Sequence, residues 1–511
     1  MLTAVTVEQM RAAEAAAIAV VGDDALMQRA AAGLATAVLR ELPGRVYGAR
    51  VLVLTGPGNN GGDGLFAGAR LARRGVRVEA CRADGGVHRR GWEALLASGG
   101  REVAVAGAAA RIGSYDLVID AILGIGGRPG LRAPWDALAQ DIARSGVRVV
   151  ACDLPSGISA DPPFGVADAI WLGDQGSAGS AEGRASGPGA SDVTPTNARM
   201  ATNQQSARAP GLIAHLRADV TVTFGERKLC HLIEPARSVC GRVESVDIGL
   251  RDVAPDVVAW EWDDVTARWP VPGPSAHKYT RGVVGLRTGS ERYPGAAVLS
   301  ATGAVHAGAG MVRYLGPAAV AAKVLDALPS VVVGTGRLDA QVLGCGWGDQ
   351  AYGTGIVAEA VASGLPLVID ADGLRYLPAR LHPGVLLTPH AGELARLLGC
   401  DRADVEADPL NRVREAAKRF GATVLLKGAT QLVATPDDPV VRVAVPGPAW
   451  TAQAGSGDVL AGMCGALLAA GVPPVDAALL AASVQAMAAS ANPGPLPPQE
   501  LARLVPLALR G

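Results

Sequence analysis

The stretch Val51-Leu-Val-Leu-Thr-Gly-Pro-Gly-Asn-Asn-Gly-Gly-Asp-Gly64 decides the fold of the first half of this chain. A short apolar strand runs directly into a loop with five glycines, two asparagines and one aspartate. Gly56, Gly58 and Gly61 have the G-x-G-x-x-G spacing, and we expect the loop to open a helix over Leu65 to Arg74. Glycines let main-chain N–H groups approach a pyrophosphate, and the helix N-terminus favours its charge. The stretch therefore predicts dinucleotide binding.

Two other interpretations of this loop stay open. Glu79 closes the next strand, where the ribose-binding acid of an NAD-dependent dehydrogenase would lie. The loop could also be a tight strand-to-helix turn without a ligand. A plain turn does not need Asn59, Asn60 and Asp63, and the two asparagines have no role in a dehydrogenase. We therefore favour a different kind of nucleotide site.

Composition excludes several classes of protein. For 511 residues, two domains of roughly 250 residues are as plausible as three. The net charge of −1 and the pI near 6.7 provide no field for nucleic acid, and no basic run suggests a membrane surface. No export signal and no apolar run of roughly 18 residues is visible, so we expect a cytoplasmic protein. The scattered cysteines, without a C-x-x-C pair, argue against disulfides and a zinc site.

Polar residues follow the other predicted strands of the first half. Asp116–Leu123 leads into a glycine-rich loop, and Val147–Cys152 ends at Asp153-Leu-Pro-Ser-Gly157. Continuous apolar runs of this kind indicate a parallel sheet covered on both faces, where ligands collect at the carboxyl ends of the strands. We expect one crevice to contain Asn60, Asp120, Asp153 and Ser156.

The composition then changes. Residues 162–211 are rich in Gly, Ser, Ala, Pro, Asn and Gln, which predicts a disordered insertion. An alternating strand follows at Ala218–Phe224, and polar, proline-rich sequence around 252–274 marks a domain boundary. We expect one domain over residues 1–252 and another over residues 253–511, with separate cores.

The second half also carries polar chemistry at its strand ends. Gly455-Ser-Gly457 offers N–H groups to an anion at the start of an apolar helix, and Asp458 lies at the edge of this hole as a base. Asp458 could instead merely cap the helix. Lys427 and His390 follow neighbouring strands, although His390 could equally be structural. A GK[ST] signature is absent from the sequence, which excludes a P-loop kinase.

The motifs GPGNNGGDG, DAILGIGGRPG and CDLPSGISAD, with GSERYPGAA, TPHAGELARLLG, KGAT and AGSGDVLAG, resemble those of the bifunctional NAD(P)H-hydrate repair family. The resemblance covers nearly the whole chain apart from the insertion. It implies an α/β fold with two doubly wound domains: an N-terminal, Rossmann-like NAD(P)HX epimerase and a C-terminal, ribokinase-like, ADP-dependent (S)-NAD(P)HX dehydratase. The implied function is metabolite repair: R- and S-NAD(P)HX are epimerised, and S-NAD(P)HX is dehydrated to NAD(P)H at the expense of ADP.

The resemblance also implies site residues. Asp153 is the acid/base of the epimerase, and its substrate loops comprise Asn59, Asn60, Gly61, Gly62, Asp63, Gly124, Ile125, Gly126, Gly127, Arg128, Pro129 and Gly130. An oxygen-rich set suited to K⁺ comprises Asn60, Asp120 and Ser156. In the dehydratase, the residues implied around the hydrate are Ala297, Gly348, His390 and the catalytic Asp458. The residues implied around ADP are Lys427, Gly428, Ala429, Thr430, Gln431 and Gly457. The resemblance also allows Mg²⁺ to accompany ADP.

The sequence departs from the family pattern in two places. The insertion falls directly after Asp161, beside the epimerase motifs, and Gly344-Cys-Gly-Trp-Gly348 replaces the more usual GPGLG, which we expect to be tolerated. Two alternative functions remain: a ribokinase-type small-molecule kinase fused to a dinucleotide-binding domain, and a non-catalytic nucleotide-sensing scaffold. We expect a homo-oligomer whose partners are NADHX, NADPHX and ADP, with neither nucleic acid nor membrane.

Overall fold

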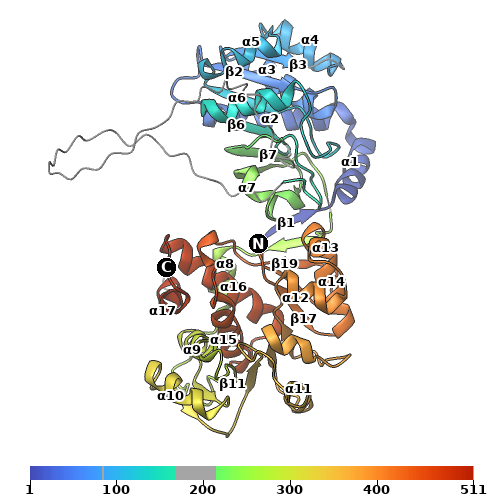
Figure 1. The fold of residues 1–511 in the computed structure, drawn as a ribbon. Coiled ribbons are helices and arrows are strands. Elements are labelled where there is room, and N and C mark those ends of the chain that lie inside the picture. The colour runs from blue at the N-terminus through green and yellow to red at the C-terminus, as the bar shows by residue number, and fades with distance from the viewer. Residues whose placement is uncertain (83–85, 167–213, 252, 510–511) are drawn as a thin grey trace, which may run out of the picture.

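The computed structural model describes residues 1–82, 86–166, 214–251 and 253–509. Two α/β units lie one above the other in Figure 1, and the N-terminus lies between them. Most of the predicted insertion, residues 167–211, lies outside the described residues. For residues 162–166 the prediction of disorder is wrong, because Phe164 is buried and its carbonyl accepts a hydrogen bond from Ser159 N at 2.9 Å.

The first unit is built on a seven-stranded parallel sheet. Its order is β4 (Arg101–Glu102), β3 (Arg77–Arg82), β2 (Arg50–Thr55), β5 (Leu117–Ala121), β6 (Arg148–Cys152), β7 (Val220–Phe224) and β9 (Arg242–Val246). Its helical elements are α1 (Val7–Val21), α2 (Asp23–Glu41), α3 (Asn59–Ala72), α4 (Arg89–Ala97), α5 (Val105–Ala109), η1 (Ile112–Ser114), α6 (Trp135–Ser145), η2 (Leu229–His231) and α7 (Arg237–Cys240).

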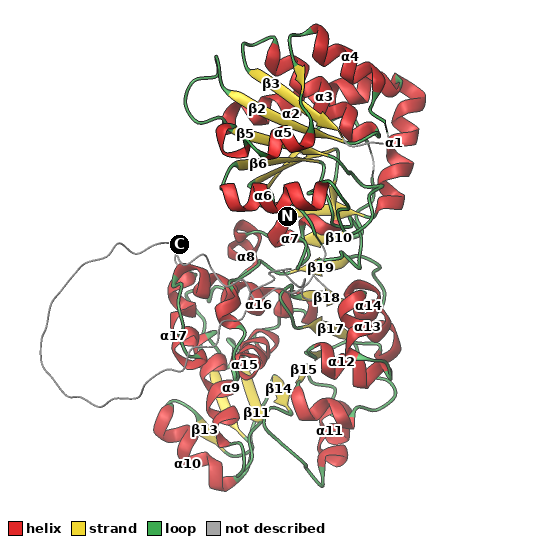
Figure 2. Ribbon diagram, turned by 45° about the horizontal axis from the view of Figure 1, so that its top comes forward, coloured by secondary structure: helices red, strands yellow, loops and turns green. Residues whose placement is uncertain are grey.

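Side-chain alternation along β2 explains why both faces of this sheet are covered. Val51 and Val53 pack with α2 and α3, whereas Leu52 and Leu54 pack in a cluster with α6. The continuous apolar run therefore belongs to a strand buried on both sides, as predicted. Figure 2 shows the strands lying between helices.

Local interactions determine where two helices of this unit begin. Thr6 and Gln9 form a capping box at the start of α1. Helix α3, however, begins at Asn59 instead of Leu65, because the glycine-rich segment itself forms the first turns of the helix.

The second unit contains a twelve-stranded sheet. Its order is β13 (Val332–Val333), β12 (Met311–Tyr314), β11 (Val283–Arg287), β14 (Ala340–Leu343), β15 (Leu367–Ile369), β16 (Val385–Leu387), β17 (Thr423–Leu426), β18 (Leu432–Ala434), β19 (Val441–Val443), β10 (Val257–Ala259), β1 (Leu2–Val5) and β8 (Arg227–Lys228). The strands from β13 to β17 are parallel to one another, while β18 is antiparallel to both of its neighbours.

Helices also cover both faces of this second sheet. They are α8 (Trp262–Arg268), α9 (Pro294–His306), α10 (Ala318–Ala327), α11 (Gly353–Ala362), η3 (Ala371–Tyr376), α12 (Ala391–Leu398), α13 (Arg402–Ala407), α14 (Pro409–Phe420), η4 (Ala449–Thr451), α15 (Ser456–Ala469), α16 (Pro474–Ala491) and α17 (Pro498–Ala508). Among the described helices, α16 alone is long and apolar enough to cross a membrane by length and composition, and most of it is buried within this unit.

The two units share a strand system and a hydrophobic core. Strand β1 pairs antiparallel with β10 and parallel with β8, so two strands from the first half extend the sheet of the second. One buried cluster contains Leu154 and Leu229 together with Leu367 and Val385. The expectation of separate cores is therefore wrong, and the boundary near residue 252 stays a prediction.

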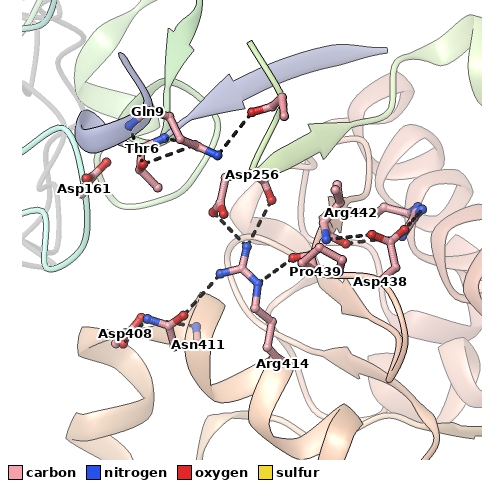
Figure 3. Close-up of polar contacts among 12 residues, drawn as sticks. Thr6, Gln9, Asp161, Asp256, Asp408, Asn411, Arg414, Asp438, Pro439 and Arg442 are labelled. Atoms are coloured by element: carbon pink, nitrogen blue, oxygen red, sulfur yellow. Dashed lines mark hydrogen bonds and ion pairs between the residues drawn. The ribbon is translucent and has the colours of Figure 1, made fainter. Parts of the chain in front are cut away.

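Polar contacts reinforce this junction (Figure 3). Gln9 donates to the Ala254 carbonyl at 3.3 Å, and the Asp161 carboxylate accepts from Val7 N at 2.9 Å. Arg414 on α14 pairs with the Asp256 carboxylate at 2.8 Å and also donates to the carbonyls of Asp256 and Pro439. Asp256 directly precedes β10, the strand that pairs with β1. Arg414 thus fixes the strand against which β1 lies.

Replacing Arg414 with Met should destabilise the protein. Several charge-assisted hydrogen bonds are lost from a mostly buried side chain, so we expect the free energy of unfolding to fall by about 2 kcal/mol. Urea titration provides the measurement. Arg402→Met, which removes an exposed ion pair with Glu406, should change the free energy of unfolding by less than about 0.5 kcal/mol. Equal losses in the two variants would contradict the role of Arg414.

Candidate active sites

The first site contains a buried carboxylate held by a serine. Asp120, at the end of β5, accepts from Ser156 N at 2.7 Å and from Ser156 Oγ at 2.6 Å. Burial raises the pKa of Asp120 to about 6, although hydrogen bonds from Ser156 and Ile122 oppose this rise. Leu123 N donates to Ser156 Oγ at 2.9 Å, which ties the loop after β5 to the loop after β6.

Asp153 is held ionised by a lysine that our sequence reasoning missed. Lys228 Nζ lies 2.5 Å from Asp153 Oδ1, and the lysine side chain is 1% exposed. Burial raises the pKa of Asp153, but the Lys228 cation outweighs it, so the net pKa lies below the usual range. Thr223 Oγ1 also donates to Asp153 Oδ1, at 3.0 Å.

The backbone of Asp153 is strained and supported. Its φ of +67° lies in the left-handed region, which is uncommon for a residue other than glycine. His231 Nε2 lies 3.0 Å from the Asp153 carbonyl, and Lys228 N donates to His231 Nδ1 at 3.0 Å. Lys228 could have been found from its position in the sequence. It lies shortly after the carboxyl end of β7, where residues of parallel sheets that contact ligands collect.

Close packing requires glycine at several positions of the opening stretch. A Cβ at Gly56 would lie 2.0 Å from the Ile122 carbonyl oxygen, and one at Gly61 would lie 2.1 Å from the Gly56 carbonyl oxygen. A Cβ at Gly62 would lie 2.9 Å from the His88 ring, whereas Gly58 borders open space. Gly61 and Gly62 are therefore needed for the close packing at the start of α3.

The predicted loops around Asn60 do come together. A Cβ at Gly124 would lie 3.1 Å from Asn60 Cγ, and Cys152 Sγ lies 3.7 Å from the Asn60 carbonyl. Asn60 Nδ2 is buried without a hydrogen-bond partner. Asp63 is buried, and burial together with Asp153 raises its pKa well above the usual range. Asn59 and the segment from Gly124 to Gly130 are at least partly exposed.

Glu79 does not lie where a ribose-binding acid would lie. Strand β3 continues to Arg82, so Glu79 is inside the strand. Its carboxylate accepts from the Tyr115 hydroxyl and pairs with Arg111 at 3.4 Å. The dehydrogenase-like position predicted for Glu79 is therefore wrong.

The second site lines a cavity of about 670 Å³ that opens between α9, α15 and the loop after β14. Gly348 and Asp458 line this cavity, as do residues that the sequence reasoning missed, Arg292, Asp372 and Arg375. The Asp372 carboxylate accepts from Gly348 N at 2.8 Å and pairs with Arg375 at 3.3 Å. Ala297 does not line the cavity: it is fully buried, and its neighbour Ala296 lines the cavity instead.

Asp458 is set to change protonation near neutral pH. Burial raises its pKa to about 7, and Asp370 adds to the rise, while Lys427 and a hydrogen bond with Cys345 oppose it. Lys427 Nζ lies 2.5 Å from Asp370 Oδ1 and 4.0 Å from Glu393 Oε2. The lysine therefore neutralises Asp370 first and leaves Asp458 without an ion pair among the described residues.

The other predicted residues of this half differ in their contacts and in their exposure. His390 caps α12, where its side chain accepts from Gly392 N at 3.0 Å, which is the structural role that the sequence left open. Gly457 is close to Lys427, because a Cβ there would lie 3.3 Å from Nζ. Thr430 accepts from Glu234 N of the first half at 2.8 Å. The remaining members, Gly428 and Ala429, are exposed, and Gln431 is half-buried.

These sites define a two-site α/β enzyme. Each unit places ionisable side chains just beyond the carboxyl ends of parallel strands, where α/β enzymes bind their ligands. In each, a lysine Nζ lies 2.5 Å from an aspartate carboxylate: Lys228 from Asp153 in the first unit and Lys427 from Asp370 in the second.

Comparison with known proteins identifies the family. Residues 284–505 match the family model described as NAD(P)H-hydrate dehydratase, and residues 23–169 match that of the YjeF-related protein N-terminus. The bifunctional NAD(P)H-hydrate repair enzyme Nnr of Mycobacterium tuberculosis H37Rv is 41% identical over 490 residues, covering 93% of this chain and 90% of that one. Nnr of Mycobacterium leprae is 40% identical over 510 residues, covering 96% and 94%. The chain belongs to the bifunctional NAD(P)H-hydrate repair enzyme family.

Family membership confirms the predicted fold class and function. The chain combines a Rossmann-like epimerase unit with a ribokinase-like dehydratase unit and is a bifunctional NAD(P)H-hydrate repair enzyme. The kinase alternative is not supported. Among solved structures, the ADP/ATP-dependent NAD(P)H-hydrate dehydratase of Bacillus subtilis, co-crystallised with ATP and Mg²⁺, is 26% identical with a TM-score of 0.47, covering 50% of this chain and 99% of that one.

Dehydration should follow the ionisation of Asp458. With a pKa of about 7, a base at this position is protonated at pH 6 and ionised at pH 8. We expect kcat/KM for dehydration to rise by about tenfold per pH unit below pH 7 and to level off above pH 8. A pH profile that is flat between pH 5.5 and 8.5 would contradict this expectation.

Replacing Lys228 with Met should impair epimerisation. Without the cation, the pKa of the buried Asp153 rises, so we expect a loss of about a hundredfold or more at neutral pH that shrinks as the pH is raised. Chiral separation of the R and S hydrates measures the rate. Lys418→Met, which changes an exposed lysine on α14, serves as the control. An undiminished epimerisation rate in the Lys228 variant would contradict the assignment.

Proposed function

We propose that Asp153 is the acid/base of epimerisation and Asp458 the base of dehydration. The observation that supports this division is the opposite electrostatic setting of the two carboxylates. Asp153 is paired with Lys228 and its pKa is lowered, whereas Asp458 forms no ion pair with any residue that the structure describes, and its pKa is raised to about 7. A carboxyl group with a pKa near neutrality suits removal of a proton from a hydroxyl. A carboxylate that a lysine keeps ionised in the resting enzyme is ready to accept a proton and stabilises positive charge that develops on the ring.

In the dehydratase, Asp458 accepts the proton of the C6 hydroxyl as its oxygen attacks the terminal phosphoryl group of ADP, and AMP leaves. The C6–O bond of the phosphate ester then breaks, phosphate departs with the bonding electrons, and loss of a ring proton restores NAD(P)H. Gly455 and Gly457 lie at the start of α15, so their N–H groups stabilise the developing charge, whereas the Ser456 N–H donates to the Gln453 carbonyl at 3.2 Å. ADP, accompanied by Mg²⁺, is the proposed phosphoryl donor.

In the epimerase, Asp153 exchanges a proton with the hydrated ring. This exchange allows C6, the carbon that bears the hydroxyl group, to invert through a ring-opened or iminium-like state. The residues from Asn59 to Asp63 and from Gly124 to Gly130 form the proposed walls for the hydrated ring. Asn60 and Gly124 lie against each other, which supports one shared pocket edge. Buried Gly61, Gly62 and Asp63 shape this edge by packing.

We propose that K⁺ binds near Asn60, Asp120 and Ser156. The residues fit a hard cation, because Asp120 is fully buried and forms no ion pair within the described ranges. The amide of Asn60 is also buried with an unsatisfied atom, so its oxygen can serve as a ligand after a rotation of the amide. A bound cation supplies charge compensation to Asp120 and keeps it ionised.

Incubation of the protein with a mixture of R- and S-NADHX and ADP tests the proposed roles together. The reduced-nicotinamide absorbance should return completely in the presence of K⁺. Asp153→Asn should stop at the fraction supplied as S hydrate, and Asp458→Asn should lower dehydration by about 10²–10⁴-fold while R and S still interconvert. Dehydration by Asp458→Asn above a tenth of the wild-type rate would contradict its role as base.

A second test addresses the adenine nucleotide. The Gly457→Val side chain would crowd Lys427 Nζ, 3.3 Å from the Cβ position, and block the approach of phosphate. We expect calorimetry to show at least a tenfold weaker ADP affinity, with little change for the hydrate. Gly355→Val, at an exposed helical glycine with open space, is the matched control. Unchanged ADP affinity would show that the anion site does not lie at Gly457.

We also propose a homo-oligomer in the cytoplasm. Exposed Ile18, Val20 and Val21 near the end of α1 support self-association, because apolar side chains gathered on a surface favour an interface. All seven cysteines are free, which is usual in a reducing compartment. Light scattering of the purified protein tests the oligomeric state, and a monomer at all concentrations would contradict it.

A further inference from the structure

Residues 227–234, the linking segment, hold Asp153 of the first site by two contacts. Lys228 Nζ lies 2.5 Å from Asp153 Oδ1, and His231 Nε2 lies 3.0 Å from the Asp153 carbonyl oxygen. Because Lys228 N donates to His231 Nδ1 at 3.0 Å, the other ring nitrogen carries the proton and donates to that carbonyl. Both the side chain and the backbone of Asp153 therefore depend on where the linking segment lies.

The other end of the linking segment contacts residues 427–431, the loop proposed to bind ADP. Glu234 N donates to Thr430 Oγ1 at 2.8 Å. Apolar side chains of the linking segment and of the residues that flank the loop share one buried cluster: Leu229, Leu232, Ile233, Leu426 and Leu432. The proposed nucleotide loop and the linking segment thus pack as neighbours.

Little chain separates the two ends of the linking segment. Leu232 N and Ile233 N both donate to the Leu229 carbonyl, at 3.0 and 3.1 Å, and they continue the short helix η2. These two residues are the only ones between His231 and Glu234, and both are buried. A shift of Glu234 is therefore passed on to His231 and is not absorbed by a loose turn.

We propose that Thr430 is a positioning residue of epimerisation, and that ADP bound to residues 427–431 accelerates epimerisation through the linking segment. This inference rests on the proposed binding of ADP to this loop. Bound ADP orders the loop, strengthens the bond from Glu234 N to Thr430, and so holds Lys228 and His231 against Asp153. The R hydrate is then converted to the S hydrate chiefly when the dehydratase is loaded with its phosphoryl donor.

The response of epimerisation to ADP tests the inference. Asp458→Asn is the background, because the hydrate is then not consumed while R- and S-NADHX still interconvert. Chiral separation should show that saturating ADP accelerates epimerisation by about five- to tenfold. Amide hydrogen exchange of residues 229–234 should slow by about threefold or more when ADP is added. Calorimetry measures the ADP affinity in parallel.

Thr430→Val in the same background removes the acceptor for Glu234 N. At ADP concentrations that calorimetry shows to be saturating, both responses should fall to less than about 1.5-fold. Thr430→Ser keeps the acceptor and should retain at least half of the acceleration. Thr266→Val is the matched control, because it removes an exposed threonine hydroxyl on α8 that donates to the Asp263 carbonyl. It should respond to ADP as the background does.

Calorimetry distinguishes the failure of this inference from the failure of the proposed function. If ADP binds but changes neither epimerisation nor hydrogen exchange, the inference is overturned and the proposed nucleotide site stands. A Thr430→Val variant that responds to ADP as strongly as the background would also overturn it. If ADP binds neither the background nor the wild-type protein, the proposed nucleotide site falls, and the inference falls with it.

Discussion

The burial of carboxylates at the carboxyl ends of parallel strands is the constraint on which both halves depend. A buried carboxylate is costly unless a cation or several donors compensate it. Each half places one lysine at 2.5 Å from one aspartate: Lys228 with Asp153 and Lys427 with Asp370. The choice of partner determines the chemistry. In the first half the lysine pairs with the proposed catalytic carboxylate, and in the second it pairs with a neighbour and leaves Asp458 poised near neutrality.

Sequence reasoning predicted the strands well because their signals are local. The apolar runs that became β2, β5 and β6 needed only their own residues to be recognised. The motifs also indicated both proposed catalytic aspartates. The start of α3 was missed because asparagines and glycines are poor helix formers, and tertiary packing against Ile122 and His88 overrode that preference.

The partners of the site residues could not be predicted from the sequence, because they come from distant segments. Lys228 is 75 positions from Asp153, and Asp370 is 57 positions from Lys427. Ala297 and Ala296 differ only in which side of one helical turn they present, a distinction that a motif does not carry. Likewise the helix-capping role of His390 depends on the orientation of its ring.

The segment from Arg227 to Glu234 shows why two chemically separate sites belong to one folding unit. Strand β8 pairs with β1 in the sheet of the second unit, and its Lys228 reaches back to Asp153 of the first. A few residues further, Glu234 N donates to Thr430 in the loop after β17. Because the same backbone carries both contacts, a division of the chain at residue 252 would separate β1 and β8 from β10, the strand that anchors them. Asp153 of the first unit is therefore held, through Lys228, by a strand that belongs to the sheet of the second unit.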